Sequence, residues 1–148
     1  MLQDTTHPPP MSDDSSQVLF AISDQPVRTL VAVSLLQCHV PYAYALVSSH
    51  AEAHHWLRMY RPLCVVMTLD IALGTGPETS LVAGLPALIP TVSLVQRSAL
   101  YPRFPEYLYA PRALHDWCTM PFTMEELLAR IQQGIDRARQ RPRSSIGA

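Results

Sequence analysis

Short apolar runs alternate along the chain with longer segments in which apolar residues recur every three or four positions. The runs lie at residues 18–22, 42–48, 62–73, 89–95 and 115–119, and each is expected to form a strand. Helices are expected after the first run, over 50–60, and after the last run. Strands that alternate with helices predict a parallel sheet covered on both faces, which is a doubly wound α/β domain.

The three regular helical segments each have an apolar face. On the first helix it comprises Val27, Leu30, Val31, Ser34, Leu35 and Cys38. On the second it comprises Ala53, Trp56, Leu57 and Tyr60, and on the last Met124, Leu127, Leu128, Ile131 and Ile135. Ser23 or Asp24 is expected to cap the first helix, and Thr123 with Glu126 forms a capping box before the last.

The segment between the fourth and fifth runs breaks this pattern. It reads "QRSALYPRFPEYLYAPRAL" and holds three prolines, so at most a short, irregular fourth helix is expected there. The same segment carries four aromatic residues, which either pack onto the sheet or form a contact surface for a partner: Tyr101, Phe104, Tyr107 and Tyr109.

Composition indicates one globular domain with loose ends. Of the 148 residues 48% are hydrophobic and 16% charged. Residues 1–17 are rich in proline, serine and acids and are expected to be a disordered tail; 18–137 form the domain; 138–148 are expected to be a flexible basic tail. For that tail, a fraying helix end is favoured over a nucleic-acid patch.

Charge and cysteine usage narrow the partners and the compartment. The net charge of −1 gives no reason to expect nucleic acid or an acidic membrane surface. No apolar run approaches the ~20 residues of a membrane-spanning helix, and the start of the chain lacks an export signal. Cys38, Cys64 and Cys118 lie in apolar segments, which favours reduced thiols in a cytoplasmic protein.

Three stretches resemble the receiver domains of two-component response regulators. "MPF" followed by "TMEELLARI" resembles the family's "KPF" and the helix after it. "LFAISDQPVR" resembles the end of its first strand, and "RPLCVVMTLDIALGTG" the region that carries its phospho-accepting aspartate. The resemblance covers residues 18–137. It implies a flavodoxin-like (CheY-like) five-stranded sheet of order 2-1-3-4-5, with the site at the carboxyl ends of the strands.

The resemblance also implies four groups at that edge, most of which this chain has replaced. A working receiver has an acid pair after the first strand, where this chain has Ser23 and Asp24. It ends the fourth strand with Ser or Thr, where Val95 stands, and the fifth with a lysine, where Met120 stands. A pocket with a thioether in place of an ammonium group is expected to be a poor site for Mg²⁺ and a phosphoryl group.

The position of the acceptor aspartate is left open by the sequence. Counting from Pro62 by the family's spacing places Thr68 there, whereas the string "LDIAL" favours Asp70. If the third strand continues through both residues, either side chain can point toward the edge. The alternatives to a role in phosphorylation are purely structural: Asp24 would cap the helix, and Asp70 would be an ordinary carboxylate in a turn.

No enzyme signature, cofactor motif or strong metal motif is present in the sequence. His50 and His54 have a spacing that can hold zinc, but a solvated helix face is the favoured interpretation. The leading hypothesis is a non-catalytic pseudo-receiver that regulates another signalling protein, or a second copy of itself, by direct contact and without aspartyl phosphorylation. The alternatives are an atypical regulator phosphorylated on Asp70 and a sensor that binds a small ligand in the vacated crevice. Binding to DNA is the weakest candidate.

Overall fold

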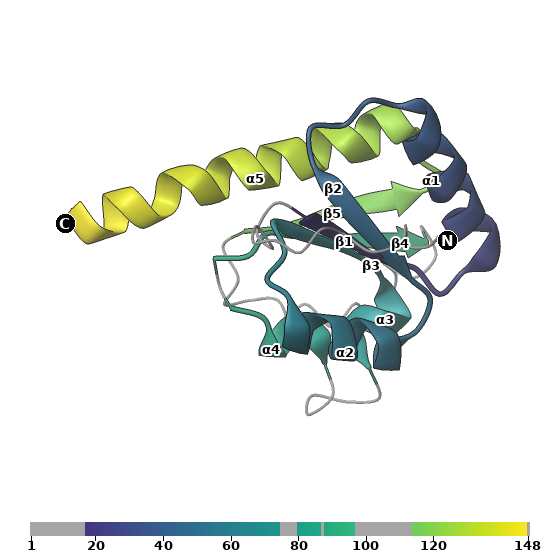
Figure 1. The fold of residues 1–148 in the computed structure, drawn as a ribbon, viewed down its shortest axis with the longest axis horizontal. Coiled ribbons are helices and arrows are strands. Elements are labelled where there is room, and N and C mark those ends of the chain that lie inside the picture. Colours follow the sequence, from purple (N-terminus) through teal and green to yellow (C-terminus); the bar gives the residue numbers. More distant parts are fainter. Residues whose placement is uncertain (1–16, 75–79, 87, 97–113, 148) are drawn as a thin grey trace, which may run out of the picture.

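The sheet of this protein is parallel, five-stranded and ordered β2-β1-β3-β4-β5, which confirms the predicted flavodoxin-like arrangement (Figure 1). The computed structural model describes residues 17–74, 80–86, 88–96 and 114–147. The strands are β1 (Gln17–Ala21), β2 (Ala43–Val47), β3 (Cys64–Thr68), β4 (Thr91–Gln96) and β5 (His115–Met120). All pairings are parallel, so the carboxyl ends of the strands meet at one edge, here called the rim.

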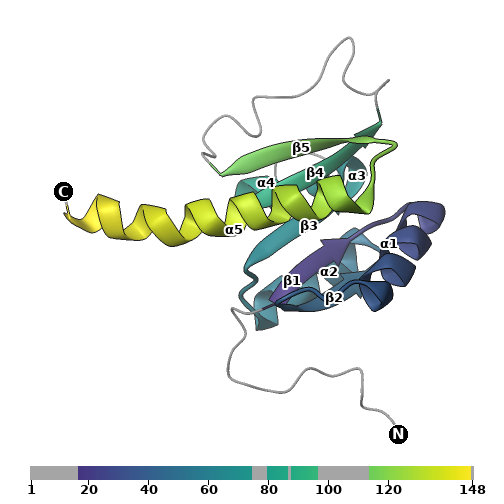
Figure 2. The same ribbon diagram turned by 90° about the horizontal axis from the view of Figure 1, so that it is seen from above.

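Helices cover both faces of the sheet (Figure 1). One face carries α1 (Gln25–Gln37) and α5 (Met124–Gly147). The other carries α2 (His50–Met59), α3 (Leu69–Leu73) and α4 (Leu81–Gly84). Figure 2 shows that the C-terminal half of α5 projects beyond the sheet. The irregular fourth helix expected in 96–114, with its four aromatic residues, lies almost wholly outside the described residues.

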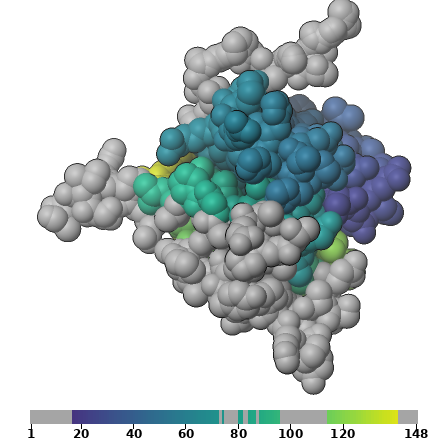
Figure 3. Space-filling view, turned by 90° about the horizontal axis from the view of Figure 1, so that it is seen from below, coloured from purple at the N-terminus to yellow at the C-terminus, as the bar shows by residue number. Residues whose placement is uncertain are grey.

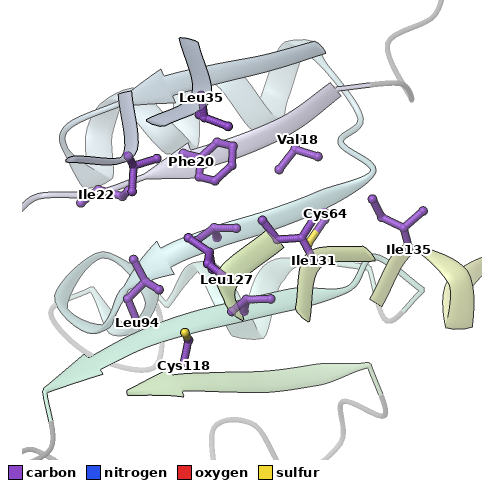
Figure 4. Packing of buried hydrophobic residues seen from close by; sticks show 13 residues of the cluster. Val18, Phe20, Ile22, Leu35, Cys64, Leu94, Cys118, Leu127, Ile131 and Ile135 are labelled. Carbon is purple, nitrogen blue, oxygen red and sulfur yellow. The ribbon is translucent and has the colours of Figure 1, made fainter. Parts of the chain in front are cut away.

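The main core fills the space between the sheet and the helices α1 and α5 (Figure 4). Alternate residues of the strands point into it, because side chains on a strand alternate between the two faces. Its buried members are Val18, Phe20, Ile22, Val31, Leu35, Cys64, Val66, Val92, Leu94, Cys118, Leu127, Ile131 and Ile135. A second cluster of buried residues under α2, α3 and α4 uses the other alternate residues, Leu19, Ala21, Val65 and Met67 among them. Burial on both faces explains the continuous apolar runs of the sequence.

The first helix begins as expected, but its buried face is narrower than predicted. Asp24 caps α1, since its Oδ1 accepts a hydrogen bond of 3.1 Å from the backbone N–H of Val27. Val31 and Leu35 are buried, whereas Leu30 is 47% exposed. The prediction that Leu30 faces the core is therefore wrong. Leu30, Val33 and Leu36 instead form an exposed apolar stripe along α1.

The third strand is shorter than the apolar run that predicted it. β3 ends at Thr68 and the chain turns at once into α3, so Asp70 lies in the first turn of a helix and not on the strand. Leucine and alanine support a helix as readily as a buried strand, and no breaker in the run marks the change. Gly74 ends α3 with φ 63°, a left-handed conformation that glycine adopts without strain.

The two ends of the domain also differ from the expected boundaries. β1 begins at Gln17, which was assigned to the N-terminal tail; residues 1–16 of that tail lie outside the described residues. Thr123 accepts the backbone N–H of Glu126 at 3.0 Å, as its half of the capping box requires, while the Glu126 carboxylate pairs with Arg130 at 3.3 Å. Because α5 continues to Gly147, residues 138–147 are helical. The flexibility of that segment stays a prediction.

Candidate functional site

Two hydroxyl groups meet at the rim, where β1 and β3 end. Thr68 is the last residue of β3 and is only 4% exposed. Its Oγ1 accepts a hydrogen bond of 3.1 Å from the backbone N–H of Ser23, in the loop that follows β1. The two side-chain hydroxyl oxygens are also 3.1 Å apart. The loop after the first strand is thus tied to the end of the third by a hydroxyl pair.

Asp70 completes a chain of three side chains. The hydroxyl of Ser23 donates to Oδ1 of Asp70 at 2.8 Å. A serine hydroxyl has a single hydrogen, so the bond between the two hydroxyls must use the hydrogen of Thr68. The order is therefore Thr68 to Ser23 to Asp70, ending on an exposed carboxylate. The sequence placed Thr68 and Asp70 as rivals for one position, and the structure connects both to Ser23.

The carboxylate of Asp24, also at the rim, is hydrogen-bonded to the backbone at the start of α1. Its Oδ1 caps α1 through Val27. Arg28, one turn into α1, donates from Nη1 to the carbonyl oxygens of Ile22 at 2.9 Å and Ser23 at 3.3 Å. These bonds fix the loop that carries Ser23 and Asp24. Sequence reasoning did not single out Arg28, because one arginine after a proline carries no motif.

Apolar side chains occupy the second-to-last position of β4 and the last position of β5. Val95 is fully buried, and its partner across the sheet is Thr119 of β5. Met120 is the last residue of β5 and packs, half-buried, against the main core beside Phe122 and Met124. A thioether carries no charge and is a weak acceptor, so Met120 cannot neutralise an anion at the rim.

The site therefore gathers part of the predicted set. Ser23, Thr68 and Asp70 are joined by hydrogen bonds, and Asp24 lies beside them in the helix cap. Tyr101, Phe104, Tyr107 and Tyr109, predicted as partner contacts, lie outside the described residues. Within the part of the chain that the structure describes, no three His, Cys, Asp or Glu side chains gather as a metal cluster.

The buried cysteines have no nucleophilic character. Burial raises the pKa of the Cys64 thiol to about 12. Burial, together with the nearby Glu126 carboxylate, raises the pKa of the Cys118 thiol to about 11. Both groups are thiols at neutral pH, and the thiolate is the form that attacks electrophiles or binds metals.

Solved structures with the same fold include response-regulator receiver domains. The chain matches a response regulator receiver protein from Sinorhizobium medicae at a TM-score of 0.63 with 18% identity, covering 86% of this chain and 99% of that one. A CheY-like receiver domain protein from Methanospirillum hungatei matches at 0.67 with 11% identity, over 85% and 98%. NtrX from Brucella abortus, solved with ADP, matches at 0.68 with 13% identity. The match covers 88% of this chain but only 28% of the NtrX chain.

At these identities the likeness establishes the fold, which is that of receiver domains. The chain matches no protein-family model and no curated protein sequence. None of the described helices is long and apolar enough to cross a membrane.

Proposed function

We propose that this protein is a regulatory module of the receiver type that acts by contact with another protein, in the cytoplasm, without aspartyl phosphorylation. The observation that carries the proposal is the hydrogen-bonded chain from Thr68 through Ser23 to Asp70 at the rim. Receiver domains are generally signalling modules and not enzymes, which supports a role of the same kind here.

Thr68 is the last residue of β3, and the proposal takes this strand end as the counterpart of the phospho-accepting aspartate of receivers. Its hydroxyl is neutral, nearly inaccessible and bonded to Ser23 on both its donor and its acceptor side. A hydroxyl at this position needs a nearby base to become a nucleophile, and its hydroxyl neighbour provides none. Thr68 is therefore proposed to hold the loop after β1 and not to accept phosphate.

Asp70 is exposed but poorly equipped as an acceptor. It lies in α3, beyond the end of β3, and it accepts the hydroxyl of Ser23. A dianionic phosphoryl group beside Asp70 and Asp24 would need a cation to offset the repulsion between like charges. The lysine of working receivers is replaced by Met120, and the guanidinium of Arg28 is bonded to backbone carbonyls.

A direct test uses a small phosphodonor. The protein is incubated with acetyl phosphate and Mg²⁺, and its intact mass is measured. No gain of a phosphoryl group is expected, because the described residues of the rim offer neither a strand-end carboxylate nor a compensating cation. A receiver with the full set of rim residues serves as the positive control in the same buffer. A stable adduct that disappears in Asp70→Ala would overturn the proposal in favour of an atypical phospho-acceptor.

The proposed contact surface includes the apolar stripe on α1. Leu30 and Val33 are each 47% exposed, and Leu36 is 79% exposed. Contiguous exposed apolar side chains on a soluble domain mark contact sites for other proteins. The aromatic residues of 97–113 remain a second predicted surface, outside the described residues. The partner is either another signalling protein or a second copy of the chain.

A charge placed on this stripe should abolish the contact. Leu36→Glu is expected to weaken the contact at least about tenfold, because a buried unpaired carboxylate is strongly unfavourable in an interface. Self-association is measured by sedimentation, and retention of a specific partner is measured by affinity capture. Gln133→Glu, an exposed position on α5, adds the same charge elsewhere and serves as the control. Identical behaviour of the wild type and both variants, or no partner and no self-association in any of them, would contradict this surface.

A further inference from the structure

A cleft of about 830 Å³ opens between α2 and α4, on the face of the sheet opposite α1 and α5. Its inner wall is apolar and is formed by four side chains, Leu57, Leu81, Leu85 and Ile89. The last three of these are between 5% and 9% exposed. Figure 3 shows α2 and α4 as neighbouring parts of this face of the molecule. The volume falls in the range of pockets that hold small organic ligands, roughly 300–1,000 Å³.

The cleft is separate from the rim. Pro62 and Ile89, which line it, precede β3 and β4 and therefore lie near the amino ends of the strands. Thr68 and Ser23 lie at the carboxyl ends, and neither lines the cleft. A ligand bound here would leave the hydrogen-bonded chain of the rim in place, so this inference does not rest on the function proposed above.

The charged side chains among the described residues of the lining are all basic. Five basic or protonatable side chains line it, namely His50, His54, His55, Arg58 and Arg61. No carboxylate is present among the described residues of the lining. The one acid of α2, Glu52, accepts the backbone N–H and the hydroxyl of Ser48 at 2.7 and 3.0 Å, and it borders a different groove. The positive field of the cleft is therefore not offset by a carboxylate within its described lining.

The combination of an apolar wall and a basic lining defines the ligand. We infer that the cleft binds a small organic anion with an aromatic or branched aliphatic body and one acidic group. The body would replace water on the leucine and isoleucine side chains. The acidic group would pair with Arg58 and Arg61, whose planar guanidinium groups can donate two parallel hydrogen bonds to a carboxylate, sulfonate or phosphate.

Zinc is a poorer fit for the same histidines. His50 and His54 lie one turn apart on α2 with their rings stacked, at 6.1 Å between centroids and 9° between planes. Zinc sites in proteins need three or four ligands that converge on one point. No third ligand joins them in the described part of the chain. The same imidazoles can instead donate hydrogen bonds to an anion.

A matched pair of fluorescent probes tests this assignment on the whole chain. 1-Anilinonaphthalene-8-sulfonate carries an aromatic body and a sulfonate, and N-phenyl-1-naphthylamine carries the same body without charge. Saturable fluorescence is expected with the anionic probe, and binding at least about tenfold weaker with the neutral one, because charge-assisted hydrogen bonds are absent. Equal affinity for both probes, or no saturable binding of the sulfonate, would overturn the inference.

Three variants locate the binding. The double variant Arg58→Gln with Arg61→Gln should weaken the sulfonate probe at least about tenfold and leave the neutral probe unchanged. Arg139→Gln, an exposed position on α5, removes one charge elsewhere and should change neither. Gly84 lines the cleft and a Cβ built there meets nothing within 4 Å, so Gly84→Phe can fill the space and block the sulfonate probe. Far-ultraviolet circular dichroism checks folding, and unchanged affinity in a folded Gly84→Phe protein would place the probe elsewhere and overturn the assignment.

Discussion

Replacing Phe20 with alanine is expected to lower the free energy of unfolding by about 3–5 kcal/mol. Phe20 is fully buried as the second-to-last residue of β1, and β1 lies between β2 and β3 in the sheet. Its ring meets that of Tyr44 edge to face, with 6.3 Å between centroids and 85° between planes. Truncation would remove these contacts and leave a cavity in the main core that the sheet cannot close. Urea unfolding followed by circular dichroism measures the loss.

A control at an exposed apolar position makes this result specific to burial. Leu36→Ala also shortens an apolar side chain, but Leu36 is 79% exposed on α1. Its effect on unfolding should stay within about 0.5 kcal/mol. If the two variants were equally destabilised, Phe20 would not lie in a close-packed core and the placement of β1 between two neighbours would be in doubt.

The alternation of apolar runs and helical periodicity was enough to predict a doubly wound α/β domain, whereas the strand order 2-1-3-4-5 was predicted from the resemblance to receiver domains. Each of the five runs overlaps an observed strand, and each capping residue, Asp24 and Thr123, lies directly before a helix. The error in the third run has a physical cause. The string "TLDIAL" is apolar enough for a buried strand and holds good helix formers, so local pattern cannot decide between the two. The turn after Thr68 is set by packing of Ile71 and Ala72 against the sheet, which is a tertiary effect.

The candidate site was predictable only as a set of positions. Sequence comparison with receivers picked out Ser23, Thr68 and Asp70, but the hydrogen bonds among them span 45 and 47 residues. Such bonds depend on how β1 and β3 pair, and a one-residue change in register would separate the two hydroxyls. That Val95 and Met120 replace the switch Ser/Thr and the lysine of receivers remains a prediction, because their burial shows only what they pack against.

The basic cleft was missed for a related reason. The histidines of "HAEAHHWLRMY" were interpreted as part of a solvated helix face, and they are largely exposed. In the folded protein these side chains line a cleft, because Leu81 and Leu85 supply an apolar wall that α2 alone does not have. A single amphipathic helix specifies which side is polar. It does not specify whether that side faces water or a concave surface.

Rebuilding the rim should convert the protein into a phospho-acceptor. The triple variant Ser23→Asp, Thr68→Asp, Met120→Lys places carboxylates at the two linked hydroxyl positions and an ammonium group at the end of β5. Together with Asp24 and Asp70, the rim would then hold four carboxylates, which would supply the hard oxygen ligands that Mg²⁺ requires. The expected result with acetyl phosphate and Mg²⁺ is a change from no adduct to a stoichiometric adduct, measured by intact mass, that is lost when Thr68 is restored.

The single variant Met120→Lys separates the two possible acceptor positions. It gives Asp70 a cation but leaves Thr68 in place, so it should remain unmodified if the end of β3 is the acceptor position. An adduct on Met120→Lys alone would assign that role to Asp70. Stability gives an independent readout, because the clustered carboxylates of the triple variant repel one another. The triple variant should melt below the wild type without metal, and Mg²⁺ should raise its melting temperature while leaving that of the wild type unchanged, since a ligand stabilises only the protein that binds it.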